Sequence, residues 1–228
     1  RMKAQRGQPE DLKASIEDLK DVLKQEPNSR PGLYFMAQAN SSLGLLDQAR
    51  AFAGDLERNY PDYLPAKLMQ VQLSMSGNDP KATVTLASDL LTRLSKTAPD
   101  RDNSPQLLAE LAEKAYLSRG AANLQMKNLP AARADFDAAK QIAPSDPTVY
   151  NNLALVSLQE NKVEDALASF ENALRVDGTN FIALNGIITQ YARSKELDKA
   201  HSRIDQALSQ YPNVAWLHFL KGQVYGFQ

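Results

Sequence analysis

The sequence of 228 residues contains no cysteine, few aromatic residues (7%) and no long apolar run. The lack of cysteine excludes a disulfide, a thiolate zinc site and a cysteine nucleophile. No apolar run approaches the roughly 20 residues that span a bilayer, so we expect no direct membrane insertion of this segment. The 26 Lys+Arg and 27 Asp+Glu leave a net charge of −1, which provides no general attraction for nucleic acid, and we expect none as a partner.

The β-branched residues valine and isoleucine are also scarce, with only 9 and 6 copies. Sheets are built largely from β-branched and aromatic residues, so a substantial sheet is not expected. Alanine and leucine, in contrast, occur 31 times each. Both are strong helix formers, and the composition therefore predicts an all-α protein.

Helix-breaking residues recur along the chain with a period of 34. Pro61 follows Pro27 by one period, and Pro212 follows Pro144 by two periods, with Gly178 at the midpoint. Proline stops a helix because it lacks the N–H and clashes with the preceding turn, and glycine permits the left-handed turn at a helix end. The spacing predicts a repeated unit of two helices.

The residues between these breakers repeat with the same period. When Pro147 is taken as the first position of a unit, small residues occupy places 8, 20 and 27 and large apolar residues occupy places 4, 7 and 24. They are Ala154, Ala166 and Ala173, and Tyr150, Leu153 and Phe170. The neighbouring units follow the same pattern, with Arg119 at place 7 and Ile188 at place 8 as departures. Small residues let neighbouring helices approach closely, and large ones fill the space between them.

This pattern resembles the tetratricopeptide repeat (TPR) family, whose unit is a helix–turn–helix of about 34 residues. The resemblance covers essentially the whole chain. Helix pairs start at Arg30 and near Tyr63, residues 1–27 end in a complete second helix after the end of a first one, and residues 215–228 form a lone first helix. It implies an all-α fold, a right-handed superhelix of antiparallel helix pairs, with the first helices lining a concave groove that binds partners.

The array is irregular in its middle. Pro99 follows Pro61 by four positions more than one period, and Pro144 follows Pro99 by eleven positions more than one period. Ser104 followed by Pro105 is a strong helix start, because a hydroxyl cap precedes a proline at the first helical position. We expect one long helix from Pro105 to about Met126, extended by roughly two turns at its start. This divides the chain into two predicted sub-arrays, 1–101 and 102–228.

No catalytic arrangement can be assembled from the sequence. His201 and His218 are the only imidazoles and fall in different predicted helices, the first at a surface place and the second at a packing place. No glycine cluster suited to a phosphate is present, and the paired acids lie on predicted exposed helix faces. We therefore expect no enzyme, no cofactor and no metal site in this segment.

In the TPR family, places 2, 5, 9, 12 and 13 of each first helix tend to face the groove. Carried over to this sequence, they give a mostly neutral surface, whose amides can both donate to and accept from an extended peptide. Some chaperone-binding relatives hold a carboxylate with Lys at place 5 and Asn at place 9, and that clamp is absent because Lys67 is followed by Val71. The candidate partner-binding residues are Tyr34, Gln38, Lys67, Asn151, Gln159, Asn185, Thr189, Arg193, Phe219 and Gln223.

Loops such as residues 59–62 look like those of bacterial TPR proteins. The segments 60–68 and 77–80 are similar to the TPR lipoproteins found with bacterial exosortase (PEP-CTERM) sorting systems, although the acylated cysteine of a lipoprotein is absent. This similarity implies the cell envelope or periplasm, whereas a scaffold in the bacterial cytoplasm fits equally well. Residues 1–7 lack the apolar core of a signal peptide, and the missing initiator methionine suggests a piece of a longer chain.

The sequence thus predicts a non-catalytic scaffold that binds a protein or peptide partner in its concave groove. Two alternatives remain open: the recognition or regulatory arm of a larger enzyme, and a structural homo-oligomerisation unit. Trp216 and Phe219 belong to an apolar cluster on the predicted last helix, which a further second helix would partly cover in a continuing array and which stays open here unless this helix itself caps the array. An open apolar face favours self-association, so we expect a weak homodimer through this helix.

Overall fold

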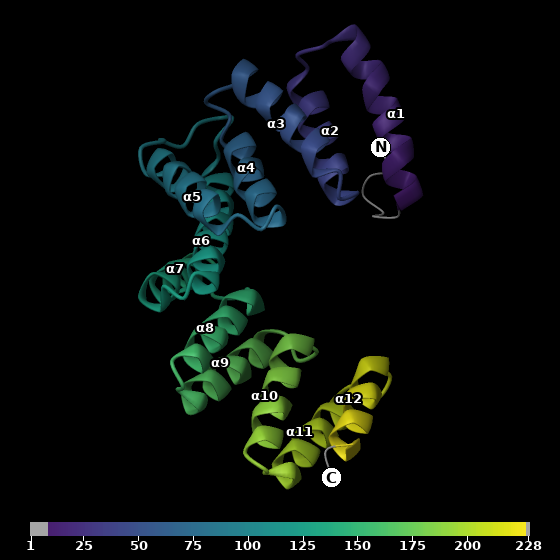
Figure 1. Cartoon of the computed structure of the whole chain (residues 1–228), viewed down its shortest axis with the longest axis vertical. Helices are drawn as coiled ribbons and strands as arrows, with labels where there is room; N and C mark the ends of the chain where they lie inside the picture. Colours follow the sequence, from purple (N-terminus) through teal and green to yellow (C-terminus); the bar gives the residue numbers. More distant parts are fainter. Residues whose placement is uncertain (1–8, 227–228) are drawn as a thin grey trace. The chain divides into compact units, whose positions relative to one another are not determined.

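The computed structural model describes residues 9–226, and all regular structure in this range is α-helical, as the composition predicts (Figure 1). The helices of this range belong to two compact units, the first ending at Met126 and the second starting at Lys127. The predicted end of a first helix at the N-terminus falls in residues 1–8, outside the described range.

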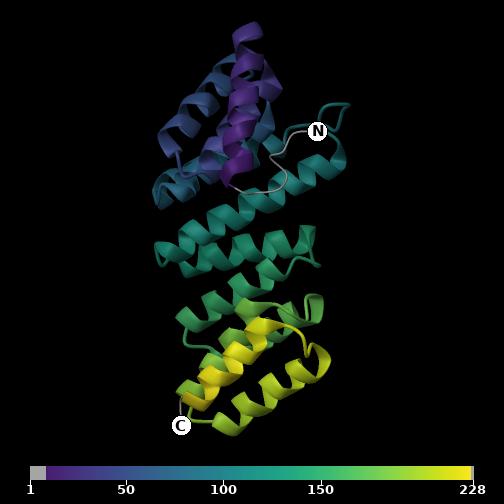
Figure 2. The same cartoon turned by 90° about the vertical axis from the view of Figure 1, so that its right-hand side faces the viewer.

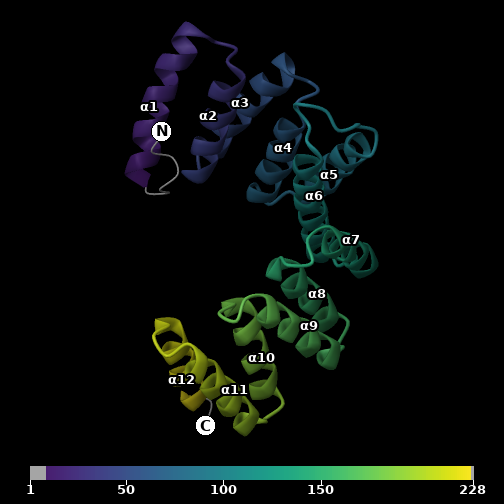
Figure 3. The same cartoon turned by 180° about the vertical axis from the view of Figure 1, so that it is seen from behind.

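Unit 1 is a series of antiparallel helices in which each helix packs on the next, and α6 packs on α4 as well as on α5 (Figure 3). Side chains such as Val71, Leu90 and Ala115 from α4, α5 and α6 are fully buried together. The helices are α1 (Pro9–Gln25), α2 (Arg30–Ser42), α3 (Leu46–Asn59), α4 (Leu64–Ser76), α5 (Pro80–Leu94) and α6 (Pro105–Gln125).

The long helix α6 (Figure 2) starts and ends where the sequence predicts it. The N–H of Leu107 donates to Oγ of Ser104 at 3.2 Å, and Pro105 occupies the first helical position. The extension is held in place because Leu111 is buried against α4 and α5. These contacts put α6 in unit 1, so the compact units divide after Met126 and differ from the predicted sub-arrays 1–101 and 102–228.

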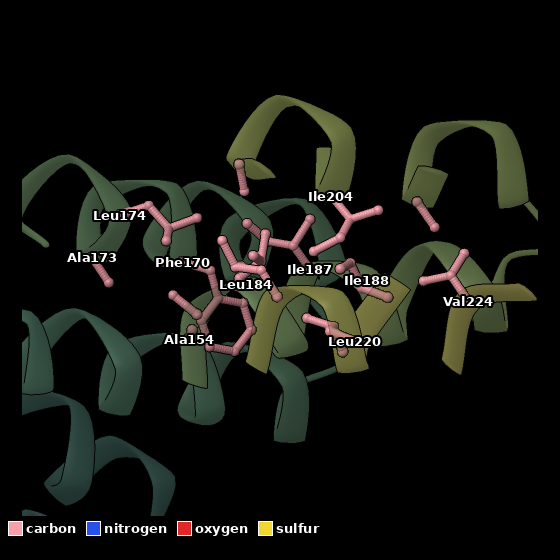
Figure 4. Close-up of a cluster of buried hydrophobic side chains, with 14 of the residues drawn as sticks. Ala154, Phe170, Ala173, Leu174, Leu184, Ile187, Ile188, Ile204, Leu220 and Val224 are labelled. Carbon is pink, nitrogen blue, oxygen red and sulfur yellow. The ribbon is translucent and has the colours of Figure 1, made fainter. Parts of the chain in front are cut away.

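Unit 2 is built in the same way, and its helices from Pro147 onward share one continuous apolar cluster (Figure 4). The ring of Phe170 is 1% exposed and lies against Gly186, where an added Cβ would come within 2.5 Å of Cζ. Ile188, a departure from the small residue expected at its place, is also fully enclosed. The helices are α7 (Leu129–Ile142), α8 (Pro147–Gln159), α9 (Val163–Val176), α10 (Phe181–Arg193), α11 (Leu197–Gln210) and α12 (Ala215–Gly226).

The turns inside the helix pairs reproduce the period in the backbone. Each contains one residue with a positive φ, between 54° and 75°, and these residues are Gly44, Asn78, Lys127, Asn161 and Lys195. Successive members are one period apart, except that the separation of Asn78 and Lys127 exceeds the period by fifteen positions. A left-handed residue reverses the chain over a very short distance at a helix end. The additional residues of the long separation lengthen the α5–α6 loop and α6.

Candidate protein-binding surface

Unit 1 carries a hollow of about 720 Å³ at the N-terminal ends of its first helices α2, α4 and α6. The loop between α3 and α4 and the loop between α5 and α6 complete its lining. Neither loop is longer than ten residues, and each is anchored by the helices that it joins. The hollow is therefore framed by helix ends and two short loops, which favours a preformed binding site.

One group of lining residues is aromatic. The guanidinium of Arg30 lies 5.0 Å from the ring centre of Tyr63 and 6.0 Å from that of Tyr60. Tyr34 meets Tyr63 edge-on, with ring centres 6.1 Å apart. The hydroxyl of Tyr60 donates to the backbone oxygen of Asn28 at 2.6 Å, which fixes that ring. Burial raises the pKa of Tyr34 and of Tyr63 above the ordinary 10.0, because it disfavours the charged phenolate.

A second group of lining residues is acidic: Asp62, Asp100, Asp102 and Glu110. Oδ1 of Asp100 accepts the N–H groups of Asn103 at 2.7 Å and of Asp102 at 2.9 Å, which fold the loop into a tight turn. Hydrogen bonds from the backbone and side chain of Asn103 lower the pKa of Asp100, because they favour the ionised carboxylate.

The hollow has an excess of negative charge. Four carboxylates face two cationic side chains, Arg30 and Lys114, and Lys114 forms an ion pair with Glu110 on its own helix. Arg101 lies between two of the acidic residues in the sequence, but it does not line the hollow. The lining therefore has a formal charge of −2, although the whole chain is almost neutral.

A smaller hollow of about 200 Å³ continues along the same surface of unit 1, between α2 and α4. Polar side chains dominate it, among them Gln38, Ser41 and Gln72. Tyr34 lines both hollows. The two hollows therefore meet at this ring and form one extended surface, which we call the α2 groove.

The α2 groove contains two of the residues that the sequence predicted, Tyr34 and Gln38. The third candidate of this unit, Lys67, lines neither hollow. Its ammonium pairs with Glu57, and the amide of Gln70 donates to the same carboxylate at 2.8 Å. Lys67 is thus engaged within unit 1.

In unit 2, Asn151 has a structural position. Its side chain is only 4% exposed, and its Nδ2 donates to Oδ1 of Asn180 at 3.0 Å. The same oxygen accepts the N–H of Ala183 and caps α10, so Asn151 joins α8 to the start of α10. The other predicted residues are half-buried (Asn185, Thr189) or exposed (Gln159, Arg193, Phe219, Gln223).

Unit 2 also exposes large apolar side chains on its first helices. Phe181, Ile182 and Phe219 are 46%, 55% and 63% exposed. The ring of Phe181 meets that of Trp216 edge-on at 5.1 Å, which connects the exposed side chains of α10 to α12. Large apolar side chains on protein surfaces ordinarily occur singly, so we call this group of three, Phe181, Ile182 and Phe219, the apolar face of unit 2.

The residues that sequence reasoning missed are mostly those without a place in the repeat. Asp100, Asp102 and Glu110 come from the additional residues between Asn78 and Lys127, where the repeat register assigns no position. The other missed residues, such as Arg30 and Tyr63, lie at repeat boundaries and outside the five groove places. The break in the period was the signal that could have located them.

The two histidines make ordinary structural contacts. His201 is half-buried with its ring centre 4.6 Å from that of Tyr225, and His218 is exposed with Nε2 2.8 Å from the backbone oxygen of Pro212. The predicted packing place of His218 was therefore wrong, whereas His201 lies at the predicted peripheral place and is partly covered by α12. Within residues 9–226, no group of three or more His, Asp or Glu side chains is placed to hold a metal ion. No helix in that range has the length and apolar character needed to cross a membrane.

Comparison with known proteins relates residues 147–180 to the family model described as tetratricopeptide repeat. Comparison with curated sequences found no match. Among solved structures, PilW, described as a widely conserved type IV pilus biogenesis factor, has a TM-score of 0.75 and 16% identity over 96% of this chain and 94% of its own. PilF of Pseudomonas aeruginosa has a TM-score of 0.70 and 15% identity over 96% and 92%. A chain of the APC/C hetero-tetramer Cut9–Hcn1 has a TM-score of 0.69 and 17% identity over 96% and 40%.

Proposed function

We propose that this chain, in which residues 147–180 match the tetratricopeptide repeat model and which shares the fold of PilW and PilF, is a non-catalytic scaffold that holds a segment of another protein. The observation that carries the proposal is the α2 groove, in which two hollows meet at Tyr34 along the first helices of unit 1. Repeat proteins bind their partners on such extended surfaces.

The chemistry of the α2 groove suits an extended peptide. Gln38 and Gln72 are exposed amides on neighbouring helices, and each can donate to and accept from a peptide backbone. Tyr34 adds a ring with a polar end, the type of side chain that is enriched at protein interfaces. The larger hollow beyond Tyr34 has room for side chains of the bound segment.

The setting that we propose is the assembly of a larger complex. PilW is described as a pilus biogenesis factor, and Cut9–Hcn1 is a hetero-tetramer. Both descriptions concern those proteins, and they support an assembly role here through the shared fold alone. The cell envelope and the cytoplasm both accommodate such a role.

The test uses peptides selected by phage display on the purified chain, with affinities measured by calorimetry. The double variant Gln38→Ala/Gln72→Ala removes two exposed amides from the α2 groove, and Gln48→Ala/Gln141→Ala removes two exposed amides from the second helices α3 and α7. A lost hydrogen bond costs about 1 kcal/mol, so we expect the groove variant to bind about 30-fold more weakly and the control variant to bind like wild type. Equal affinities for both variants would reject the groove as the binding surface.

We propose in addition that the apolar face of unit 2, with Phe181, Ile182 and Phe219, supports weak self-association. The specific observation in its favour is the exposure of these three large side chains on α10 and α12. Burial of the apolar surface of these side chains between two copies of the chain would stabilise association by about 25 cal/mol per Å², before the entropy cost of binding is subtracted. We therefore expect a dimer whose population rises with concentration.

A further inference from the structure

The larger hollow of unit 1 exists because the array departs from its period. The turn residues Asn78 and Lys127 are separated by fifteen more positions than in a regular pair. The additional residues form the α5–α6 loop and the first turns of α6, and they supply Asp100, Asp102 and Glu110 to the lining. This acidic lining is therefore a property of this chain, added to a repeat that lacks it.

The aspartates of the lining can still bind a cation from outside the chain. Among the described residues, no Lys or Arg lies within ion-pair distance of the Asp62, Asp100 or Asp102 carboxylates, whereas Glu110 has Lys114. Within the loop, Asp100 accepts three hydrogen bonds at Oδ1 and a single one, from Nδ2 of Asn103 at 3.3 Å, at Oδ2, so Oδ2 is the less engaged oxygen. Carboxylates beside a hollow of this size can receive the planar, multiply donating guanidinium group better than a compact ammonium.

The aromatic side chains provide a second, independent feature for the same ligand. Arg30 already lies over Tyr63 at 5.0 Å and near Tyr60 at 6.0 Å, so those two rings hold a guanidinium of the chain itself, and among the described residues Tyr34 is the lining tyrosine with no cation over it. Tyr34 lines the same hollow and is close enough to Glu110 for the carboxylate to affect its titration. Tyrosine faces and carboxylates together attract a cation more strongly than either group alone.

We propose that the larger hollow binds arginine side chains of the partner segment, so that the α2 groove selects partners with a basic stretch. The proposal rests on the proposed function, because it assigns a sequence preference to the same surface. Two arginines would balance the formal charge of −2 that the lining carries. Charge complementarity of this kind contributes mainly to specificity and to the rate of association.

The test is an NMR titration of the ¹⁵N-labelled chain with the peptide acetyl-Gly-Arg-Gly-Arg-Gly-amide. The control peptide replaces both arginines with citrulline, which has the same shape without the charge. We expect the arginine peptide to shift the amide signals of residues 59–65 and 100–114, to bind at least fivefold more tightly than the citrulline peptide, and to weaken as salt screens the charges. Equal binding of the two peptides, or shifts confined to other residues, would overturn the proposal.

Two matched variants separate a local effect from a general one. Asp62→Asn/Asp102→Asn neutralises two lining carboxylates, and Glu164→Gln/Asp165→Asn neutralises two exposed carboxylates of α9 in unit 2. Each exposed charge pair contributes modestly, so we expect about fivefold weaker binding of the arginine peptide to the first variant and unchanged binding to the second. An equal loss in both variants would also overturn the proposal.

The outcome is distinguishable from that of the proposed function. If peptides selected by phage display depend on Gln38 and Gln72 but the citrulline peptide binds as well as the arginine peptide, the scaffold function stands and the arginine preference fails. If the arginine peptide binds at the hollow but the selected peptides ignore Gln38 and Gln72, the preference stands and the extended groove fails.

Discussion

The substitution Gly186→Ala tests how tightly the core of unit 2 is packed. An added Cβ would lie 2.5 Å from Cζ, 2.6 Å from Cε2 and 3.0 Å from Cδ2 of Phe170, all shorter than a normal van der Waals contact. The ring is only 1% exposed and belongs to a continuous cluster with Leu184 and Ile187, so it has little room to move. Glycine at this position therefore serves the close approach of α10 to α9.

Two opposing terms determine the size of the effect. Alanine in a helix interior is favoured over glycine by about 1 kcal/mol, which would stabilise α10. Overpacking a filled core costs about 1–3 kcal/mol, because side chains leave their preferred rotamers or the backbone shifts. We expect Gly186→Ala to lower the free energy of unfolding of unit 2 by about 1 kcal/mol. Gly222→Ala in α12 meets no heavy atom within 4 Å and should instead raise it by up to about 1 kcal/mol.

The assay is urea unfolding followed by tryptophan fluorescence. Trp216 is the only tryptophan of the chain and packs against the core of unit 2, so its emission reports on this unit. The slope of the free energy of unfolding against urea concentration should stay the same, while the midpoint of the transition changes. In a chain that already carries Phe170→Leu, the further change Gly186→Ala should cost much less stability than it does in the wild type, since the smaller leucine side chain removes the close contact. If Gly186→Ala stabilised unit 2 as much as Gly222→Ala, the packing argument would be refuted.

Three further predictions concern a helix cap, an ion pair and an exposed ring. Ser104→Ala should lower the free energy of unfolding of unit 1 by about 1 kcal/mol, measured by urea unfolding followed by circular dichroism, because the N-terminal cap of α6 is lost. Ser104→Asn, which keeps a capping side chain, should unfold like the wild type. An unchanged midpoint for Ser104→Ala would contradict the role of Ser104 as a cap. Glu160 accepts hydrogen bonds from Lys162 and Arg133, both 2.9 Å away, and these bonds lower its pKa below the ordinary 4.5. The stabilisation that the ionised Glu160 provides is present above pH 4.5 and is lost as the pH falls through its lower folded-state pKa. Glu160→Gln should therefore lower the free energy of unfolding by up to about 1 kcal/mol at pH 7 and by progressively less in acid, as measured by urea unfolding. A loss of stability that does not depend on pH would show that the ionised carboxylate is not its cause. Phe219→Ser should abolish the rise of mass with concentration in light scattering, and a wild-type chain that stays monomeric at every concentration would remove the case for self-association.

The repeat period predicted the fold well because it reports on packing between neighbours. Places occupied by Ala154, Ala166 and Ala173 are all fully buried, since close helix approach leaves room for no larger side chain. Ser104 and Pro105 predicted the start of α6 because capping is a local effect. These features depend on residues close in the sequence or one repeat away.

The binding surface was predicted only in part, because it depends on contacts that a single repeat does not encode. Asn151 occupies a groove place in the register, but its amide is engaged by Asn180, which ends the same repeat and caps the first helix of the next one. Lys67 occupies another such place and is engaged by Glu57 of α3. Tyr34 does line the surface, but the larger of its two hollows is completed by the α5–α6 loop, which the period cannot position.

The central claim is that the α2 groove contacts a protein partner, and site-specific photo-crosslinking tests it most directly. A photoreactive benzoylphenylalanine is placed at Gln38, inside the groove, or at Gln48, which is exposed on α3, and the protein is irradiated in the cells from which the chain comes. We predict a discrete covalent adduct with another protein from position 38 and none from position 48. Adducts of equal yield from both positions, or from position 48 alone, would contradict the account.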